Sequence, residues 1–381
     1  MAEGKRSKRA DGDGLIRQRQ NGLWEIQFTV PDGGRKSVYG KTLTEARNKR
    51  KSALKLIDEG VDLDKAKMTL AAYLDLWLET QVKPTRAPRT HASYAELARI
   101  HIVPKLGHVK LIELTPAHIV DLMRAKEREG KSPRTVEMIR SVLVTSLGRA
   151  EKWGMIPRNV ARLTDAPKAR SAEVQPMTPE QARAFLASIQ GDRLEALYRV
   201  ALSLGLRQGE ALGLSWEDID LEAETLRVRH TLQRLHGQLS LKEPKTEKSR
   251  RTLPLPAYTV HALRAHRIRQ LEERLVAGGR WEDTGLVFTT PVGGPLDGGN
   301  LLKLYRMHLA AAGLPAFRFH DLRHSAASLL LAQGISPHEV QATLGHAHYA
   351  TTMDIYAHLY PETRQRVAAA MDAILSEGVA V

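Results

Sequence analysis

Residues 320–325 read His-Asp-Leu-Arg-His-Ser, a stretch richer in charged and polar side chains than a packed helix needs. His320 and Arg323 are three residues apart, so a helix would place both side chains on one face. Arginine binds phosphate through its planar fork, and histidine can move a proton near neutral pH. His320 and His324 also have the spacing of a metal-binding pair. However, the chain has no HExxH motif, no cysteine and no carboxylate cluster beside them, which favours phosphate chemistry.

Two upstream segments carry side chains suited to the same chemistry. Residues 205–214, GLRQGEALGL, place Arg207 between glycines at an expected helix start, where backbone N–H groups add positive potential for a phosphate. Residues 241–255, LKEPKTEKSRRTLPL, place Lys245 in a turn between two expected strands. A lysine there can donate a proton if its pKa is lowered.

A fourth segment lies closer to the C-terminus. Residues 344–358, LGHAHYATTMDIYAH, hold His346 and, ten residues later, Tyr356 on an expected short helix. A single arginine or tyrosine of this kind is most often structural, so the interpretation depends on the whole set. In order and context, the set resembles the catalytic residues of the tyrosine recombinase family, also called phage-type integrases: Arg207, Lys245, His320, Arg323, His346 and Tyr356. The resemblance covers about residues 178–360 by motif and, more loosely, the whole chain.

The resemblance implies an enzyme that cuts and rejoins DNA without a metal or cofactor. Arg207, Arg323 and His346 would hold the non-bridging oxygens of the phosphate and offset the charge of the transition state. Tyr356 would attack phosphorus and form a 3′-phosphotyrosyl link, which stores the bond energy until a second strand is joined.

Proton transfer is the second part of the implied chemistry. Lys245 would protonate the leaving 5′ oxygen, and His320 would assist. Lys242 and Lys248 stay open as replacements for Lys245, because they lie in the same segment. Glu210, one helical turn after the first arginine of the set, is expected to orient that arginine.

The region around these motifs is expected to mix helices with a short sheet. Thr178 and Gln181 form a capping box with Pro179 in the first turn, which opens the region. The expected strands cover residues 221–229, 235–242, 251–255 and 286–289. The expected helices cover residues 257–277, 298–311, 320–333, 337–344, 351–359 and 363–375.

A helical bundle with a net positive charge is expected before this region, over about residues 69–165. The expected helices cover 70–81, 90–106, a stretch that begins with Pro116 after the cap Thr115, and 134–153. In the last of these helices, six residues keep one face apolar or small: Ile139, Val142, Leu143, Ser146, Leu147 and Ala150. Residues 163–176 lack periodicity and contain two prolines, which is typical of an interdomain linker.

The N-terminal segment alternates polar and apolar residues as strands do. The dipeptide Asn21-Gly22 is the strongest short hairpin signal, and the expected strands cover residues 15–20, 23–30 and 36–39. Thr42 and Glu45 form a capping box for a helix that ends near Gly60. A small basic sheet of this kind can lay strands in a DNA groove, and a merely solvated basic face stays open as the alternative.

Composition supports a polyanionic partner. The 381 residues include 57 Lys and Arg against 43 Asp and Glu, a net charge of +14. Residues 1–172 hold 34 basic and 20 acidic side chains, so the excess lies in the N-terminal half. No apolar run reaches the about 18 residues that span a bilayer, and there is no cysteine and no signal peptide, so we expect a cytoplasmic, nucleoid-associated protein.

The expected fold class is multidomain and mainly α with small β sheets. Four parts are expected: an arm-type DNA-binding domain at 1–62 with a three-stranded sheet and a helix, a helical core-type DNA-binding domain at 68–165, a linker at 166–176, and a mixed α+β catalytic domain at 177–381. The resemblance also implies double-stranded DNA attachment sites as partners and a homotetramer assembled on them. Participation of a directionality factor or a DNA-bending host protein stays open.

Three functions are consistent with the sequence. The first is an integrase that inserts and excises a phage or mobile element, favoured over a chromosome-dimer resolvase because a two-domain resolvase has no use for the N-terminal sheet. The second is a type IB topoisomerase-like relaxase, which shares the tyrosine chemistry. The third is a non-catalytic DNA-binding repressor or architectural protein that uses only the basic half.

Overall fold

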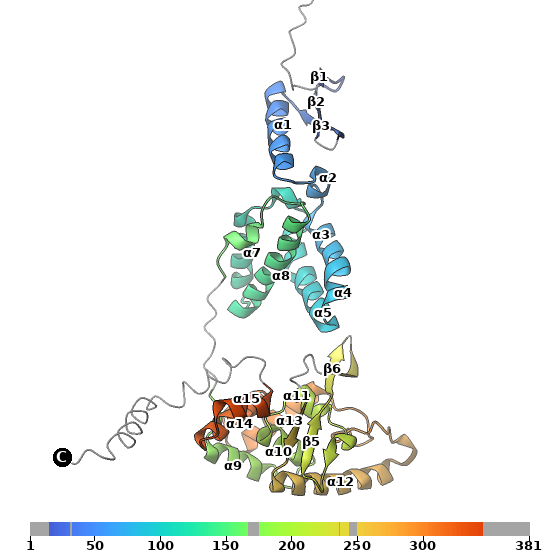
Figure 1. Ribbon diagram of the computed structural model, residues 1–381, viewed down its shortest axis with the longest axis vertical. Coiled ribbons are helices and arrows are strands. Elements are labelled where there is room, and N and C mark those ends of the chain that lie inside the picture. The colour runs from blue at the N-terminus through green and yellow to red at the C-terminus, as the bar shows by residue number, and fades with distance from the viewer. Residues whose placement is uncertain (1–14, 31–32, 167–174, 236, 244–249, 346–381) are drawn as a thin grey trace, which may run out of the picture. The chain divides into compact units, whose positions relative to one another are not determined.

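The chain divides into two compact units, Met1–Ser171 and Ala172–Val381. The computed structural model describes residues 15–30, 33–166, 175–235, 237–243 and 250–345. Both units are mainly helical with small antiparallel sheets, which confirms the expected fold class (Figure 1).

The N-terminal sheet forms where the sequence predicts it. Its strands pair antiparallel in the order β1-β2-β3: β1 Leu15–Gln18, β2 Trp24–Thr29 and β3 Arg35–Gly40. Gly22 turns the chain between β1 and β2 with a φ of 80°, a left-handed value that glycine adopts without strain. The side-chain oxygen of Asn21 supports this turn by accepting from the Leu23 N–H at 3.2 Å.

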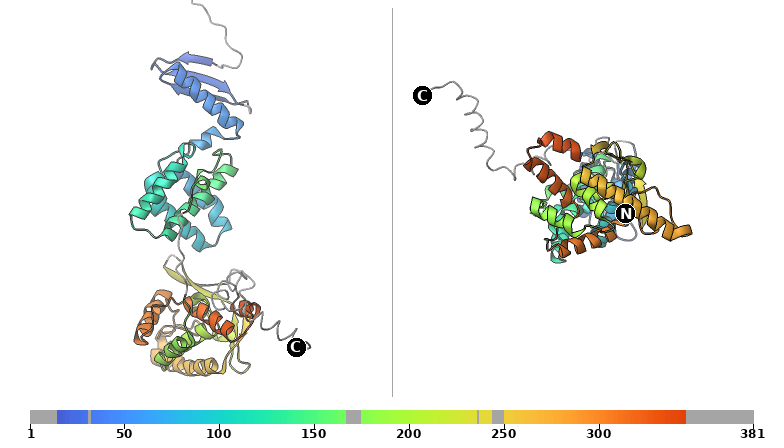
Figure 2. Two further views of the ribbon diagram at one scale, coloured as in Figure 1. Left: turned by 90° about the vertical axis from the view of Figure 1, so that its left-hand side faces the viewer. Right: turned by 90° about the horizontal axis from the view of Figure 1, so that it is seen from below.

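Helix α1, Leu43–Asp58, covers one face of this sheet, as the left panel of Figure 2 shows. Thr42 caps it by accepting from the Glu45 N–H at 3.1 Å, as predicted. The Glu45 carboxylate reaches back to the N–H of Lys41 at 2.7 Å, one residue before the position expected for a capping box. The small core between sheet and helix contains Phe28, Val30 and Ala53.

The rest of the first unit is a helical bundle. Its elements are α2 Leu63–Ala66, α3 Leu70–Trp77, η1 Leu78–Val82, α4 Lys83–Thr85, α5 Pro88–Leu97, η2 Ala98–Ile102, α6 Val103–Leu106, η3 Leu111–Glu113, α7 Pro116–Arg128, α8 Pro133–Lys152 and η4 Val160–Leu163. The capping residues Thr115 and Ser132 accept from backbone N–H groups at the starts of α7 and α8. The face of α8 predicted to be apolar is fully buried, with Ile139, Val142, Leu143, Ser146, Leu147 and Ala150 each at 0% exposure.

Two continuous helical stretches of the bundle, α3-η1-α4 and α5-η2-α6, each contain an internal proline. Pro84 lies at the second position of α4 and Pro104 at the second position of α6, each directly after a π-helical turn, η1 or η2. Proline has no N–H to donate into the helix, and a wider turn before it accommodates the ring. The helix that was expected to end near residue 81 therefore continues as far as Thr85.

The second unit contains the remaining elements. They are α9 Pro179–Ser188, α10 Glu195–Ser203, α11 Gln208–Leu212, η5 Trp216–Asp218, β4 Ile219–Asp220, β5 Thr225–Val228, β6 Thr231–Leu235, β7 Gln238–Lys242, β8 Arg251–Pro254, α12 Ala257–Ala277, η7 Gly278–Arg280, α13 Gly298–Ala311, α14 Asp321–Ala332 and α15 Pro337–Leu344. Helix α10 contacts α12 and α14, and six of its residues are buried. The helices expected at 351–359 and 363–375 lie outside the described residues.

The strands of the second unit form two separate antiparallel sheets. Strand β5 pairs with β8, whereas β7 pairs with β6 in a separate hairpin. The strand expected at 235–242 begins only at Gln238, because Gly237 turns the chain with a φ of 82°. The sequence lacked the Asn-Gly signal there, so β6 was missed.

The strand predicted at residues 286–289 is wrong. Leu286 and Thr289 form only isolated bridges, to Ser215 and Pro295 respectively. The N–H of Val287 donates to the carbonyl of Leu214 at 2.8 Å. The carbonyls of Leu286 and Val287 instead accept from the side chain of Gln270 in α12, at 3.1 and 3.0 Å. The run is buried and apolar, as in a central strand, but its carbonyls bind to a helix.

Candidate active site

Arg207 lies immediately before α11 and is partly exposed. Its Nη1 donates to Oε1 of Glu210 at 2.6 Å, and its backbone N–H donates to Oε2 of Glu210 at 3.1 Å. The arginine side chain keeps 40% of its surface exposed, whereas the glutamate side chain keeps 5%. The structure therefore brings Glu210 against Arg207, the arginine that it was expected to orient.

Glu210 has a second arginine partner, which the sequence interpretation missed. Nη2 of Arg251, at the start of β8, donates to Oε2 of Glu210 at 3.2 Å. Burial alone would raise the pKa of Glu210, but the charges of Arg251 and Arg207 outweigh burial and the pKa is lowered. Glu210 is therefore ionised at neutral pH. The quoted segment 241–255 contains Arg251, but only its lysines were considered.

Arg323 is almost fully enclosed, with 2% exposure, in α14. Its Nη1 donates to the Gly205 carbonyl at 2.7 Å and its Nη2 to the Leu344 carbonyl at 2.6 Å. Burial and the positive charges of Arg207 and Arg251 lower its pKa to about 9, and it stays charged at neutral pH. A Cβ on Gly205 would approach Leu344 Cδ2 to 2.2 Å, so glycine is required for this close approach.

The C-terminal end of α15 receives all three arginines. The carbonyl of Thr343 accepts from Arg251 Nε at 2.9 Å, and the carbonyl of Gly345 accepts from Arg207 Nη2 at 3.5 Å. With the Leu344 contact, three successive carbonyls of the helix end each have a guanidinium partner. Cations are favoured here, since the last carbonyls of a helix carry partial negative charge. Residue 346 follows directly in the sequence.

His320 precedes α14 and lies near this cluster. Its imidazole is 5.0 Å from that of His324 between ring centroids, in an edge-to-face arrangement. Although the residue is exposed, desolvation lowers its pKa to about 4, aided by the charges of His324, Arg323 and Arg207. His320 is therefore neutral at pH 7.

Three residues of the predicted set cannot be placed. Lys245, His346 and Tyr356 lie outside the described residues, as does the alternative Lys248. Lys242 ends β7 and is exposed. The segment that carries Lys245 lies in sequence between β7 and β8, and these two strands belong to different sheets.

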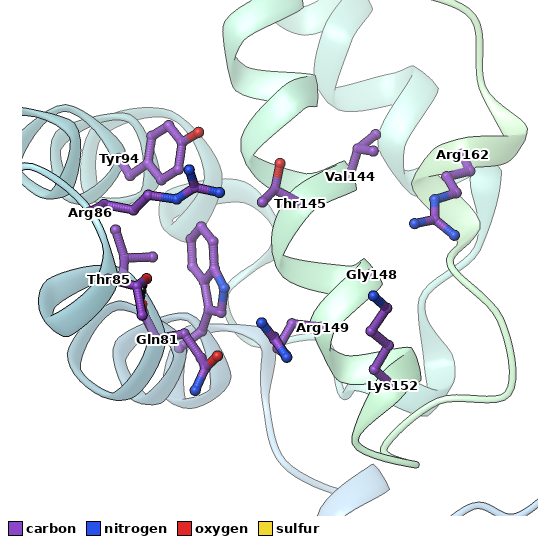
Figure 3. A pocket seen from close by; sticks show the side chains of 12 residues that line it. Gln81, Thr85, Arg86, Tyr94, Val144, Thr145, Gly148, Arg149, Lys152 and Arg162 are labelled. Atoms are coloured by element: carbon purple, nitrogen blue, oxygen red, sulfur yellow. Dashed lines mark hydrogen bonds between the residues drawn. The ribbon is translucent and has the colours of Figure 1, made fainter. Parts of the chain in front are cut away.

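The helical bundle contains a basic pocket of about 320 Å³ between α3, α5 and α8 (Figure 3). Trp77 and Tyr94 stack on one side, with ring centroids 5.7 Å apart. Four cationic side chains line the pocket and no acidic residue does: Arg86, Arg149, Lys152 and Arg162. Gly148 gives Arg162 room, because a Cβ there would lie 3.1 Å from Arg162 Nη2.

The N-terminal sheet has a second charged cluster, around a single carboxylate. Nε of Arg17 and Nε of Arg19 donate to Oε2 of Glu25 at 2.7 and 2.9 Å, and the Arg19 guanidinium lies 5.0 Å from the centroid of the Tyr39 ring. Hydrogen bonds from Arg19 and Arg17 lower the pKa of Glu25 to about 2. Arg17 and Arg19 keep 56% and 44% of their side-chain surface exposed, so the cluster presents a cationic face.

Neither a metal-binding cluster nor a membrane-spanning helix occurs in the parts of the chain that the structure describes. No three His, Cys, Asp or Glu residues of these parts gather where they could hold an ion. None of the described helices is both long and apolar enough to cross a bilayer.

Two family models match the chain. The model of the phage integrase family matches residues 175–363, and the model of the phage integrase N-terminal SAM-like domain matches residues 69–125. A protein from Caldanaerobacter subterraneus subsp. tengcongensis, named tyrosine recombinase XerC-like, is 33% identical over 349 residues, which cover 87% of this chain and 89% of that protein. An integrase from Streptomyces ambofaciens is 33% identical over 387 residues, with 98% and 99% covered.

Solved structures share the fold. The integrase of the Tn1549 transposon, in complex with transposon right end DNA, matches with a TM-score of 0.69 at 22% identity, covering 81% of this chain and all of that one. A lambda integrase tetramer bound to a Holliday junction matches with a TM-score of 0.58 at 19% identity, covering 91% and 96%.

Proposed function

The chain belongs to the phage integrase family of site-specific tyrosine recombinases, and from this premise we propose that it integrates and excises a mobile DNA element through a 3′-phosphotyrosyl link to Tyr356. One observation carries the proposal. Arg207 and Arg323 converge at the end of α15, directly before His346, which itself precedes Tyr356 by ten residues. Phosphoryl transfer without a metal needs such a cluster of preorganised positive charge.

In this proposal the residues act in three roles. Arg207, Arg323 and His346 hold the non-bridging oxygens, and Tyr356 attacks phosphorus while the 5′ oxygen leaves. Lys245 gives the leaving oxygen its proton. His320, which the lowered pKa keeps neutral, assists in this proton transfer.

DNA binding is assigned to the basic first half. We propose that residues 68–165 bind the core-type site, where the cationic pocket of α8 takes a backbone phosphate, and that residues 1–62 bind arm-type sites through the face with Arg17 and Arg19. Assembly as a tetramer on paired sites is supported by the lambda integrase tetramer on a Holliday junction. A directionality factor or DNA-bending host protein is an additional partner to test, and a nucleoid location follows from DNA binding.

Replacing a pocket lysine is expected to weaken DNA binding in a salt-dependent way. Lys152→Gln removes one cation, so the slope of log affinity against log salt should become shallower by about 1. Arg128→Gln, an exposed change outside the pocket, is the charge-matched control. Binding isotherms at several salt concentrations measure the slope. A slope equal to that of Arg128→Gln would show that the pocket holds no phosphate.

Arg207→Ala is expected to form the covalent DNA adduct about 10²–10³-fold more slowly, because one fixed donor to the developing phosphorane charge is lost. Arg207→Lys keeps the charge but not the planar fork of the guanidinium. Its rate should therefore lie between the rate of the unaltered enzyme and that of Arg207→Ala. The control is Arg264→Ala, which removes an exposed arginine paired with Glu222 on the surface. A rate for Arg207→Ala equal to that of the control, at saturating DNA, would remove Arg207 from the site.

The proposed function itself is tested on DNA next to the gene. Cells that express the enzyme beside its own flanking DNA should accumulate new junctions, and deep sequencing of these junctions should show one shared crossover sequence. Junctions at that sequence that require Tyr356 support the integrase. Relaxation of supercoils without new junctions would favour a topoisomerase-like relaxase, and DNA binding without either activity would favour a repressor.

A further inference from the structure

Arg251 and Arg250 are adjacent in sequence but have opposite environments. The Arg250 side chain is 53% exposed and pairs with Glu243 on the surface. The Arg251 side chain is 7% exposed and pairs with Glu210, whose own side chain is 5% exposed. Successive residues of an extended chain point to opposite sides, which explains the difference. A buried arginine is seldom retained unless its charge is paired, so the contacts of Arg251 call for a role.

The contacts of Arg251 join two parts of the site. One nitrogen, Nη2, donates to Glu210, which in turn accepts from the partly exposed Arg207. Another nitrogen, Nε, donates to the carbonyl of Thr343 in the last turn of α15 at 2.9 Å. The planar guanidinium therefore fixes the distance between the carboxylate that orients Arg207 and the helix end that leads to residue 346.

We propose that Arg251 is a positioning residue for DNA cleavage, which holds Arg207 through Glu210 and holds the end of α15 through Thr343. This inference rests on the proposed function, because it concerns the same phosphate site. Arg251 does not need to touch DNA in this role. It keeps the phosphate-binding arginine and the segment that carries His346 and Tyr356 in register with each other.

The charge of Arg251 also keeps Glu210 ionised. Three cations surround this carboxylate: Arg207 beside its own helix, Arg251 on β8 and Arg323 on α14. Burial acts in the opposite direction and favours the protonated acid. Without Arg251 the pKa of Glu210 should rise, and the carboxyl should take up a proton at a higher pH. A protonated Glu210 would no longer hold Arg207 by charge.

The test compares adduct formation by Arg251→Gln and by the matched control Arg250→Gln. Rates are measured per folded molecule at saturating DNA, using the crossover site found by junction sequencing. Arg251→Gln should be slower by about 10²-fold, the loss typical of a misplaced reacting group. Its rate should also fall on the acid side at a higher pH than in the unaltered enzyme. Arg250→Gln should change neither property.

Two further variants separate positioning from a merely structural role. In the double variant Glu210→Gln/Arg251→Gln the titrating carboxyl is gone. The acid limb, which is the fall of the rate toward acid pH, should then return to the pH at which it occurs in the unaltered enzyme. The rate itself should stay low. Arg251→Lys keeps a charge beside Glu210 but cannot span to Thr343. It should therefore keep the normal acid limb with a reduced rate, and it serves as the test if Arg251→Gln does not fold.

Two results are distinguishable failures. If the unaltered enzyme forms no adduct, the proposed function is wrong. If the unaltered enzyme forms the adduct, and both Arg251→Gln and Arg251→Lys form it as fast as Arg250→Gln does, only the role of Arg251 is wrong.

Discussion

Tyr356→Phe is expected to bind its DNA site as tightly as the unaltered enzyme and to cut none of it. The substitution removes only the phenolic oxygen, which is the proposed nucleophile, while the ring and the charge of the site stay the same. Gel-shift affinity and denaturing gels for covalent adduct measure the two properties on one DNA. This variant separates a recombinase from a repressor. A repressor would form no adduct before or after the substitution, whereas a recombinase loses its adduct and keeps its DNA affinity.

Two other tyrosines near Tyr356 provide matched controls. Tyr349→Phe and Tyr360→Phe remove the same atom from the same segment of sequence. Both should form the adduct at the normal rate. Adduct formation by Tyr356→Phe, together with its loss in one of the other two, would move the nucleophile to that residue and leave the family assignment standing.

Lys245→Ala is expected to slow cleavage of ordinary DNA by about 10²–10⁴-fold, the usual contribution of a general acid. A 5′ oxygen is a poor leaving group unless it receives a proton. Sulfur in the bridging 5′ position leaves readily without one, so Lys245→Ala should recover most of its rate on the sulfur substrate. Arg207→Ala and Tyr356→Phe should not recover, because they lack phosphate stabilisation and the nucleophile.

The sulfur substrate also decides between the candidate lysines. Lys242→Ala and Lys248→Ala should cleave ordinary DNA at nearly the normal rate and gain little from sulfur. If Lys245→Ala stays inactive on the sulfur substrate while one of the other two is rescued, the general acid is that other lysine. The comparison is made between variants on one substrate, which removes differences in DNA affinity.

Local sequence signals predicted the parts of the fold that depend on neighbouring residues. Asn21-Gly22 gave the first hairpin, and Thr115 and Thr178 gave helix starts, because turns and caps are set by a few adjacent residues. The strand prediction at 286–289 failed because the carbonyls of Leu286 and Val287 accept from the side chain of Gln270 in α12, which no local pattern shows. The predicted end of the helix near residue 81 was wrong because a π-helical turn before Pro84 overrides the usual effect of proline.

The site was predicted in the same uneven way. Arg207, Glu210, His320 and Arg323 stand in short motifs, and the structure brings the first two into direct contact. Arg251 could not be singled out, because its partners Glu210 and Thr343 are 41 and 92 residues away. A buried arginine and an exposed one look alike in sequence, as Arg251 and Arg250 show.

The most direct test of the central claim is to identify the bond between enzyme and DNA. The unaltered enzyme is incubated with its crossover site, the covalent complex is isolated under denaturing conditions, and both components are digested. Mass spectrometry should then find a peptide that contains Tyr356 linked through its phenolic oxygen to a 3′ phosphate. A link from the DNA to any other residue, or a link from Tyr356 to a 5′ phosphate, would contradict the account.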